Sequence, residues 1–315
     1  MRVVLLAGGV GGAKMADGLA ATVGEDLTVI VNTGDDLELH GLAIWPDHDT
    51  VAYTLAGLDD EVRGWGIRGE SWTVMDRLEA LGEVAWFRLG DKDLATHLWR
   101  TDRLRAGYRP TEVAVELATA MGVKPRILPM ADEPVRTEVR TDEGWLEFQE
   151  YFVHRHQEPV VHEVRFRGVD QARATPEVLA TVAAAEVIVI APSNPIVSID
   201  PILAVAGVRP ALDEARERGV PIAAVSGIIG GKALKGPADK MLASLGEVST
   251  AAGVASHYAG LITHFVMDEA DAMLRPEVDA QGPETLVTDT IMTDDAARMR
   301  LAKEVLRFAR AVTIS

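Results

Sequence analysis

Four glycines lie within five positions near the start of the chain, and a lysine follows them: Gly8, Gly9, Gly11, Gly12 and Lys14. They stand between a short apolar run, residues 2–6, and a helix-like run, residues 15–21. A glycine loop lets backbone N–H groups approach a phosphate, because no Cβ blocks the way. The start of a helix adds the positive end of its dipole. This stretch therefore predicts a phosphate-bearing ligand at the C-terminal edge of the first strand.

The glycine pattern does not match either common phosphate-binding motif. A P-loop needs Gly directly before its Lys and Ser or Thr directly after it, whereas Ala13 and Met15 flank Lys14. The dinucleotide pattern G-x-G-x-x-G, begun at Gly9, reaches Lys14 where its third Gly belongs. A tight turn without a ligand is the alternative, but such a turn does not require four glycines.

Carboxylates dominate the polar loops that follow the apolar runs: Asp35, Asp36, Asp47, Asp49, Asp91 and Asp93. Two or three of them converging on a diphosphate would hold Mg²⁺, a hard cation that prefers oxygen ligands. Simpler roles stay open, because Asp49 and Asp91 could each cap a helix and Lys92 could be a solvated surface charge. The histidines near these loops lack a zinc-binding spacing. Trp65, between two glycines, is the tryptophan best placed to stack on a planar ring.

Composition limits the classes of partner. The chain has 315 residues, a formal net charge of −17 and no cysteine. The negative charge argues against nucleic-acid and anionic-membrane surfaces, and the missing thiols exclude disulfides and cysteine nucleophiles. No apolar run reaches the length of a membrane helix, and no signal-peptide pattern stands at the N-terminus. We expect a cytoplasmic protein with small-molecule substrates.

The order of apolar runs predicts a doubly wound, mostly parallel α/β sheet of the Rossmann-like kind with a smaller α+β insert. Buried strands are expected at 2–6, 27–31, 85–89, 186–190, 221–225 and 264–267, and helices at 51–58, 72–81, about 94–105, 111–121 (capped by Thr111), 176–185 and 299–312. Residues 1–125 and 171–315 would form the core, and residues 126–170 the strand-rich insert, with strands at 135–139, 145–152 and 161–166. Polar loops at the strand ends would line one crevice: residues 8–12, 32–36, 90–93, 192–194 and 226–231. The alternative is that polar loops merely follow strands.

An ordered series of motifs covers nearly the whole chain, at residues 8–14, 32–36, 46–51, 64–67, 89–97, 129–132, 191–195 and 230–232. It closely resembles the 2-phospho-L-lactate transferases, which build the deazaflavin coenzyme F-420. Val10 stands where such loops often carry Thr, so one side-chain contact to phosphate is in doubt. The resemblance implies a guanosine diphosphate donor that carries lactate or enolpyruvate, the deazaflavin Fo as acceptor, release of GMP, and a need for Mg²⁺.

The resemblance also suggests roles for individual residues. The glycine loop with Lys14, Asn32, Ser193, Asn194 and Gly230 would hold the guanosine diphosphate. Asp49 would bind Mg²⁺ or act as general base, Lys92 would act at the acceptor or the migrating phosphate, and Trp65 and Asp91 would contact the acceptor. Asp35 and Asp36 would join Asp49 at the metal.

Two other functions remain open from the sequence. A nucleotidyltransferase can carry a similar glycine loop and would release pyrophosphate. A nucleotide-sugar-binding regulator of the same fold would bind without turnover. The sequence does not decide which three-carbon acid is carried, and a homodimer is the expectation for the oligomeric state.

Overall fold

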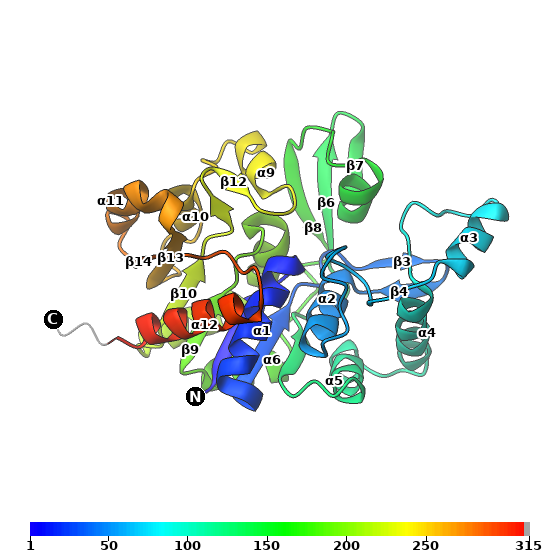
Figure 1. The fold of residues 1–315 in the computed structure, drawn as a ribbon, viewed down its shortest axis with the longest axis horizontal. Coiled ribbons are helices and arrows are strands. Elements are labelled where there is room, and N and C mark those ends of the chain that lie inside the picture. Colours follow the sequence, from blue (N-terminus) through cyan, green and yellow to red (C-terminus); the bar gives the residue numbers. More distant parts are fainter. Residues whose placement is uncertain (312–315) are drawn as a thin grey trace.

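A seven-stranded parallel sheet forms the centre of the computed structural model, which describes residues 1–311 (Figure 1). Its strand order is β14-β13-β10-β9-β1-β2-β5, and every pair is parallel. The strands are β1 (Val3–Ala7), β2 (Leu27–Val31), β5 (Arg126–Pro129), β9 (Val187–Ile190), β10 (Ile222–Val225), β13 (His264–Asp268) and β14 (Glu284–Thr288). The predicted doubly wound α/β class is confirmed.

The strand order reverses between β1 and β9. From β1 the chain builds outward through β2 and β5, then returns to β9 on the other side of β1. In such sheets the ligand crevice opens at the carboxyl ends of the two strands where the order reverses. Residues 8–12 and 191–194 follow those two strands and therefore lie at this point.

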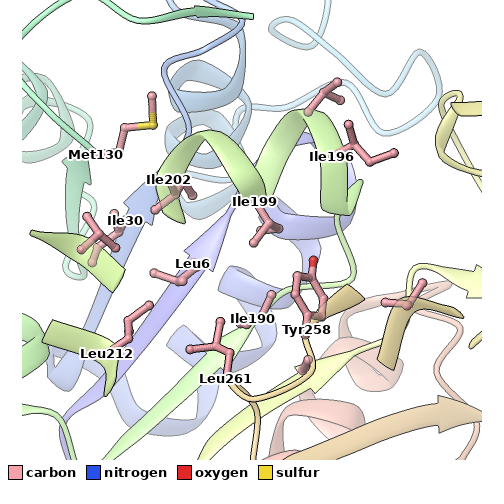
Figure 2. Close-up of a cluster of buried hydrophobic side chains, with 14 of the residues drawn as sticks. Leu6, Ile30, Met130, Ile190, Ile196, Ile199, Ile202, Leu212, Tyr258 and Leu261 are labelled. Carbon is pink, nitrogen blue, oxygen red and sulfur yellow. The ribbon is translucent and has the colours of Figure 1, made fainter. Parts of the chain in front are cut away.

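Both faces of the sheet are buried, which explains why its strands are continuous apolar runs. Val3, Leu5 and Ala7 pack with α1 (Gly9–Val23) and α12 (Asp295–Ala309), which lie side by side on one face (Figure 1). Val4 and Leu6 face the opposite cluster, where Figure 2 shows Leu6, Ile30 and Ile190 among Ile196, Ile199, Ile202, Leu212, Tyr258 and Leu261.

Smaller elements surround the sheet. The helices are α2 (Pro46–Leu55), α3 (Thr73–Ala80), α4 (Asp91–Arg105), α5 (Pro110–Ala120), α6 (Pro176–Ala184), α7 (Asp200–Ala204), α8 (Val208–Glu217), α9 (Ala238–Ser244), α10 (Ala251–His257) and α11 (Arg275–Asp279). Two hairpins, β3 (Leu37–Leu39) with β4 (Leu42–Ile44) and β11 (Ile228–Ile229) with β12 (Lys232–Ala233), lie outside the main sheet. A separate antiparallel sheet contains β6 (Arg136–Thr141), β7 (Gly144–Glu147) and β8 (Glu163–Arg167). No helix of residues 1–311 is long and apolar enough to span a membrane.

Several local predictions were wrong. Residues 85–89 are not a strand, and residues 145–152 divide into β7 and a π-helical turn, Glu150–His154. Helix α2 begins at Pro46 rather than at residue 51, because proline suits the first turn of a helix. Pro110 likewise begins α5, so Arg109 rather than Thr111 is its N-cap residue. The predicted C-terminal helix reached residue 312, which lies outside the described residues.

The predicted insert begins within the main sheet. β5 occupies residues 126–129 and pairs with β2, while the separate three-stranded sheet begins at residue 136 and ends at residue 167. The edge strand β14 and the hairpin β3–β4 were not predicted.

Candidate functional site

A cavity of about 560 Å³ opens at the carboxyl ends of β1 and β9. This volume lies within the range of small-molecule sites, about 300–1,000 Å³. The lining combines the first turn of α1 and residues 192–194 with several aromatic side chains. Of the residues expected at the site from the sequence, the lining includes Gly8, Gly9, Gly11, Asp35, Asp49, Trp65, Ser193 and Asn194.

The glycine turn combines tight packing with one open edge. A Cβ on Gly11 would lie 2.2 Å from the carbonyl oxygen of Pro192, so glycine is required there for the contact between α1 and the loop after β9. Gly9 has a φ of +62° and nothing within 4 Å of its would-be Cβ. Gly8 is the N-cap residue of α1 and has no side chain to cap the helix. The Gly9 amide donates to Asp47, so the amides of Val10 and Gly11 are the ones that the first turn can offer to an anion.

Asp47 and Asn32 hold this turn against β2. Asp47 accepts hydrogen bonds from the Gly9 amide at 2.8 Å and from Asn32 Nδ2 at 2.9 Å. Ser193 Oγ donates to the Gly8 carbonyl at 2.7 Å. Burial raises the pKa of Asp47 to about 6, although the hydrogen bonds from Asn32 and Gly9 oppose the shift. Asn32 thus supports the turn through Asp47 and does not line the cavity.

Asp35 and Asp36 are buried carboxylates with incomplete partners. Each has one oxygen, Oδ1, without a hydrogen bond among the described residues. Burial raises the pKa of both well above the usual range, with the charge of Asp47 adding to the effect at Asp35. Uncompensated buried carboxylates favour a proton or a cation. Asp35 lines the cavity, so a cation that prefers oxygen ligands, such as Mg²⁺, fits this position.

Asp49 is instead paired with a cation of the protein. Its Oδ1 accepts a hydrogen bond from Arg100, whose side chain is fully buried and stacks over Trp45 at 4.5 Å from the ring centroid. Burial alone would raise the pKa of Asp49, but Arg100 and the hydrogen bond from His48 outweigh it and hold the pKa at about 2. Asp49 lies within α2, where its amide donates to the Trp45 carbonyl, so it is not an N-cap residue.

Asp49, Asp93 and His97 form a buried group whose ligand atoms all lie within 4.8 Å of one another. This spacing is compatible with a metal ion, but Arg100 Nη1 lies 3.1 Å from His97 Nδ1. Arginine can only donate, so Nδ1 must accept and Nε2 carries the proton of the neutral ring. Nε2 then faces Asp93 Oδ1 at 3.3 Å, and Tyr53 donates to the same oxygen at 2.5 Å. Hydrogen bonds engage part of this group, but Asp49 Oδ2 and His97 Nε2 have no hydrogen-bond partner among the described residues, so the group stays compatible with a metal ion.

Several side chains of the cavity lining are aromatic. Trp65, Trp86, Phe87, Phe148 and Phe152 line it, and they come from three separate segments of the chain. Phe148 and Phe152 stack at 5.5 Å between ring centroids. This surface suits a planar ring system.

Seven predicted site residues do not line this cavity: Gly12, Lys14, Asn32, Asp36, Asp91, Lys92 and Gly230. Lys14 Nζ donates to the Met292 carbonyl at 2.8 Å and lines a smaller neighbouring cavity. Lys92 Nζ donates to the Arg68 carbonyl at 2.8 Å. Asp91 accepts from the amides of residues 73 and 74 and so caps α3. The Gly230 amide donates to Asp271.

Sequence reasoning missed several residues of the site. Arg100 is two turns into α4 and 51 residues from Asp49, and no local pattern links the two. Trp86 and Phe87 were assigned to a strand, and Phe148 and Phe152 to the insert. The two adjacent aromatic residues in the segment 85–89 were the feature that could have pointed to the site. Lys235 lines the cavity and lies three residues beyond the last motif of the series.

Comparisons with known proteins agree over almost the full length. A family model described as 2-phospho-L-lactate transferase CofD matches residues 3–305. A phosphoenolpyruvate transferase of Streptomyces griseus subsp. griseus is 43% identical and covers 99% of each chain. A 2-phospho-L-lactate transferase of Methanosarcina mazei is 37% identical and covers 97% of this chain and 99% of that protein. A crystal structure of a UPF0052-family protein from Bacillus halodurans has a TM-score of 0.63, covers 97% of this chain and 98% of that chain, and is 14% identical, which supports the fold alone.

Proposed function

The chain belongs to the 2-phospho-L-lactate transferase family, and on that basis we propose that it transfers a phospho-three-carbon-acid group from a guanosine diphosphate donor to the ribityl hydroxyl of Fo. The ribityl oxygen forms a bond to the phosphorus that bears the acid, the bond from that phosphorus to the oxygen of GMP breaks, and the hydroxyl proton is lost. The product lies on the route to coenzyme F-420.

The observation that carries this proposal is the mixed lining of one large cavity. The lining includes the first turn of α1 and polar side chains at the reversal of strand order, which is where diphosphates bind in open α/β sheets. It also includes aromatic side chains of the kind that a deazaflavin ring would contact. One continuous cavity could therefore hold donor and acceptor together, and phosphoryl-type transfer depends mainly on such positioning.

Mg²⁺ fits the acidic side of this cavity. Asp35 would hold it most directly, since it lines the cavity and has an unpartnered oxygen. Asp36 and Asp49 each have one unpartnered oxygen as well, but Asp36 does not line the cavity and Asp49 is already paired with Arg100. When bound, the ion would neutralise charge on the diphosphate.

The chain's own residues would orient the reactants. Asp49 is a weak base at neutral pH, because its pKa is held at about 2. Its role in the proposal is to fix Arg100 and, through Arg100, the tautomer of His97 at the cavity wall. The proposal gives Lys92 and Asp91 no contact with the substrates, because neither residue lines the cavity.

The test is to incubate the protein with Fo, Mg²⁺ and each guanosine-diphospho acid in turn, and to measure GMP and the phosphorylated deazaflavin. Relatives named for either acid are similar over the whole chain, so lactyl and enolpyruvyl donors are assayed side by side. In a parallel incubation with a nucleoside triphosphate, release of pyrophosphate would favour a nucleotidyltransferase. Donor binding without any turnover would favour a regulator.

A further inference from the structure

A second cavity of about 80 Å³ lies beside the first, next to the N-terminal end of α1. Seven residues line both cavities: Val10, Thr50, Tyr53, Gly64, Trp65, Gly66 and Lys235. One water needs about 10–15 Å³ by this measure, so the space is enough for a few waters or for one carboxylate or phosphate. It is too small for a second nucleoside.

Three cationic side chains line this smaller cavity, and they differ in how their charge is used. Arg298 pairs with three carboxylates, at 2.5 Å from Glu61, 3.2 Å from Asp17 and 3.1 Å from Asp295. Lys14 makes one hydrogen bond, to a backbone carbonyl. Lys235 has no hydrogen bond or ion pair within residues 1–311.

The ammonium of Lys235, an exposed residue, lies close to Gly64, in a segment that lines both cavities. Its Nζ lies 2.5 Å from the position that a Cβ on Gly64 would occupy, and Gly64 has a φ of +81°. Only glycine leaves this space open. Burial, together with the positive charges of Arg298 and Lys235, lowers the pKa of Lys14, although Glu61 and Asp59, which line the same cavity, oppose the shift. Asp59 lines the same cavity, and burial raises its pKa.

The larger cavity offers less to an anionic group. Its two arginines already have partners: Arg63 lies 2.5 Å from Asp60, and Arg88 lies 2.5 Å from Asp76. A donor whose diphosphate sits at Gly9–Gly11 would carry its acid on the neighbouring phosphorus. Val10, in the same turn, lines both cavities, so the smaller one is within reach of that acid.

We propose that the smaller cavity is the subsite for the carboxylate of the three-carbon acid, which Lys14 and Lys235 bind. This inference rests on the proposed function for the identity of the ligand. A charge-assisted hydrogen bond contributes about 1.5–3 kcal/mol, so losing Lys235 should weaken binding of the acid roughly tenfold to a hundredfold.

The first experiment uses phosphoenolpyruvate alone and needs neither nucleotide nor turnover. Its dissociation constant is measured by thermal shift for the wild type, Lys235→Met and Lys14→Met, with inorganic phosphate as the comparison anion. Lys240→Met is the matched control, because Lys240 is exposed on α9 and lines neither cavity. We expect tenfold or greater loss in Lys235→Met and no loss in the control. Failure of the wild type to bind at millimolar concentration, or an equal response with inorganic phosphate, would overturn the carboxylate subsite.

The second experiment compares the acid-bearing donor with GDP. Lys235→Met should weaken the donor at least tenfold and leave GDP within about twofold, because GDP has no acid. Equal losses would mean that Lys235 binds the diphosphate, and the proposal would be wrong. If phosphoenolpyruvate binds through Lys235 but no guanosine donor is turned over, the anion subsite stands and the proposed function fails.

Discussion

Replacing Asp49 with asparagine should destabilise the fold, because it leaves a fully buried arginine without its counter-charge. Arg100 has no exposed surface, and Asp49 is its only carboxylate partner among the described residues. The shape of the side chain is kept, so the change isolates the charge.

The size of the effect follows from what Arg100 retains. Removing one partner of a buried ion pair costs about 3–5 kcal/mol. Arg100 keeps its hydrogen bonds to the Ala43 carbonyl and to His97, and asparagine can still offer an oxygen, so we expect about 3 kcal/mol. With an unfolding entropy of about 2.1 cal/mol/K per residue, a chain of 315 residues loses about 1.5 °C per kcal/mol, so the melting temperature should fall by about 4–5 °C.

The assay is thermal unfolding of Asp49→Asn followed by circular dichroism, with Asp213→Asn as the matched control. Asp213 pairs with Arg209 at 3.2 Å on the exposed side of α8, where both side chains are more than one-third exposed. Such pairs contribute about 0.5 kcal/mol or less. An Asp49→Asn shift no larger than that of the control would refute the reasoning.

A double-mutant cycle with Arg100→Met separates the ion pair from other losses. Methionine keeps an unbranched chain in the space over Trp45 and removes the charge. The double variant should then be more stable than the sum of the two single losses implies, by about 2 kcal/mol, because no buried charge is left unpaired. Additive losses would show that Asp49 and Arg100 stabilise the fold independently.

Three further predictions concern other parts of the chain. Gly11→Ala should destabilise the fold by roughly 1–3 kcal/mol through overpacking, and more than Gly9→Ala does, because only the first places a Cβ against a backbone oxygen; equal melting temperatures would contradict this. Burial opposes protonation of His257, but Asp200 and Glu247 raise its pKa to about 9. Protonated His257 should therefore contribute about 2–3 kcal/mol to the free energy of unfolding. This contribution is fully present below about pH 6.5 and is lost as the pH rises through 9. Denaturant unfolding of His257→Gln should therefore show a larger deficit at pH 6 than at pH 10, and a pH-independent deficit would contradict it. GDP with Mg²⁺ should raise the melting temperature more than ADP does, and equal shifts would count against a guanosine site.

The main sheet could be predicted from sequence because its strands are buried on both faces. Val3–Ala7 and Val187–Ile190 are short continuous apolar runs, and this pattern needs no tertiary information. The edge strand Glu284–Thr288 is only partly buried and mixes polar with apolar residues, so it lacked that signal. Residues 85–89 carried the signal of a strand, but the fold uses Trp86 and Phe87 to line a cavity instead.

The site was harder to predict, because its residues are paired by tertiary contacts that no spacing encodes. Gly8, Gly9 and Gly11 line the cavity, yet Gly11 is also needed for contact with Pro192, which lies in the loop after β9. Lys14 and Lys92 were assigned to the phosphates from their motifs. The structure gives each a backbone carbonyl partner outside the larger cavity.

The electrostatics of the cavity link these results. Its lining contains four carboxylates, Asp35, Asp47, Asp49 and Asp93. The positive charge of Arg100 is already paired with Asp49. A diphosphate donor would therefore enter an acidic environment, in a chain whose net charge is −17. Binding then depends on positive charge that the carboxylates have not already neutralised: the first turn of α1, the two lysines of the smaller cavity, and a divalent cation brought by the ligand. The acidic residues are therefore compatible with an anionic substrate, because they favour binding of its metal complex over binding of the metal-free anion.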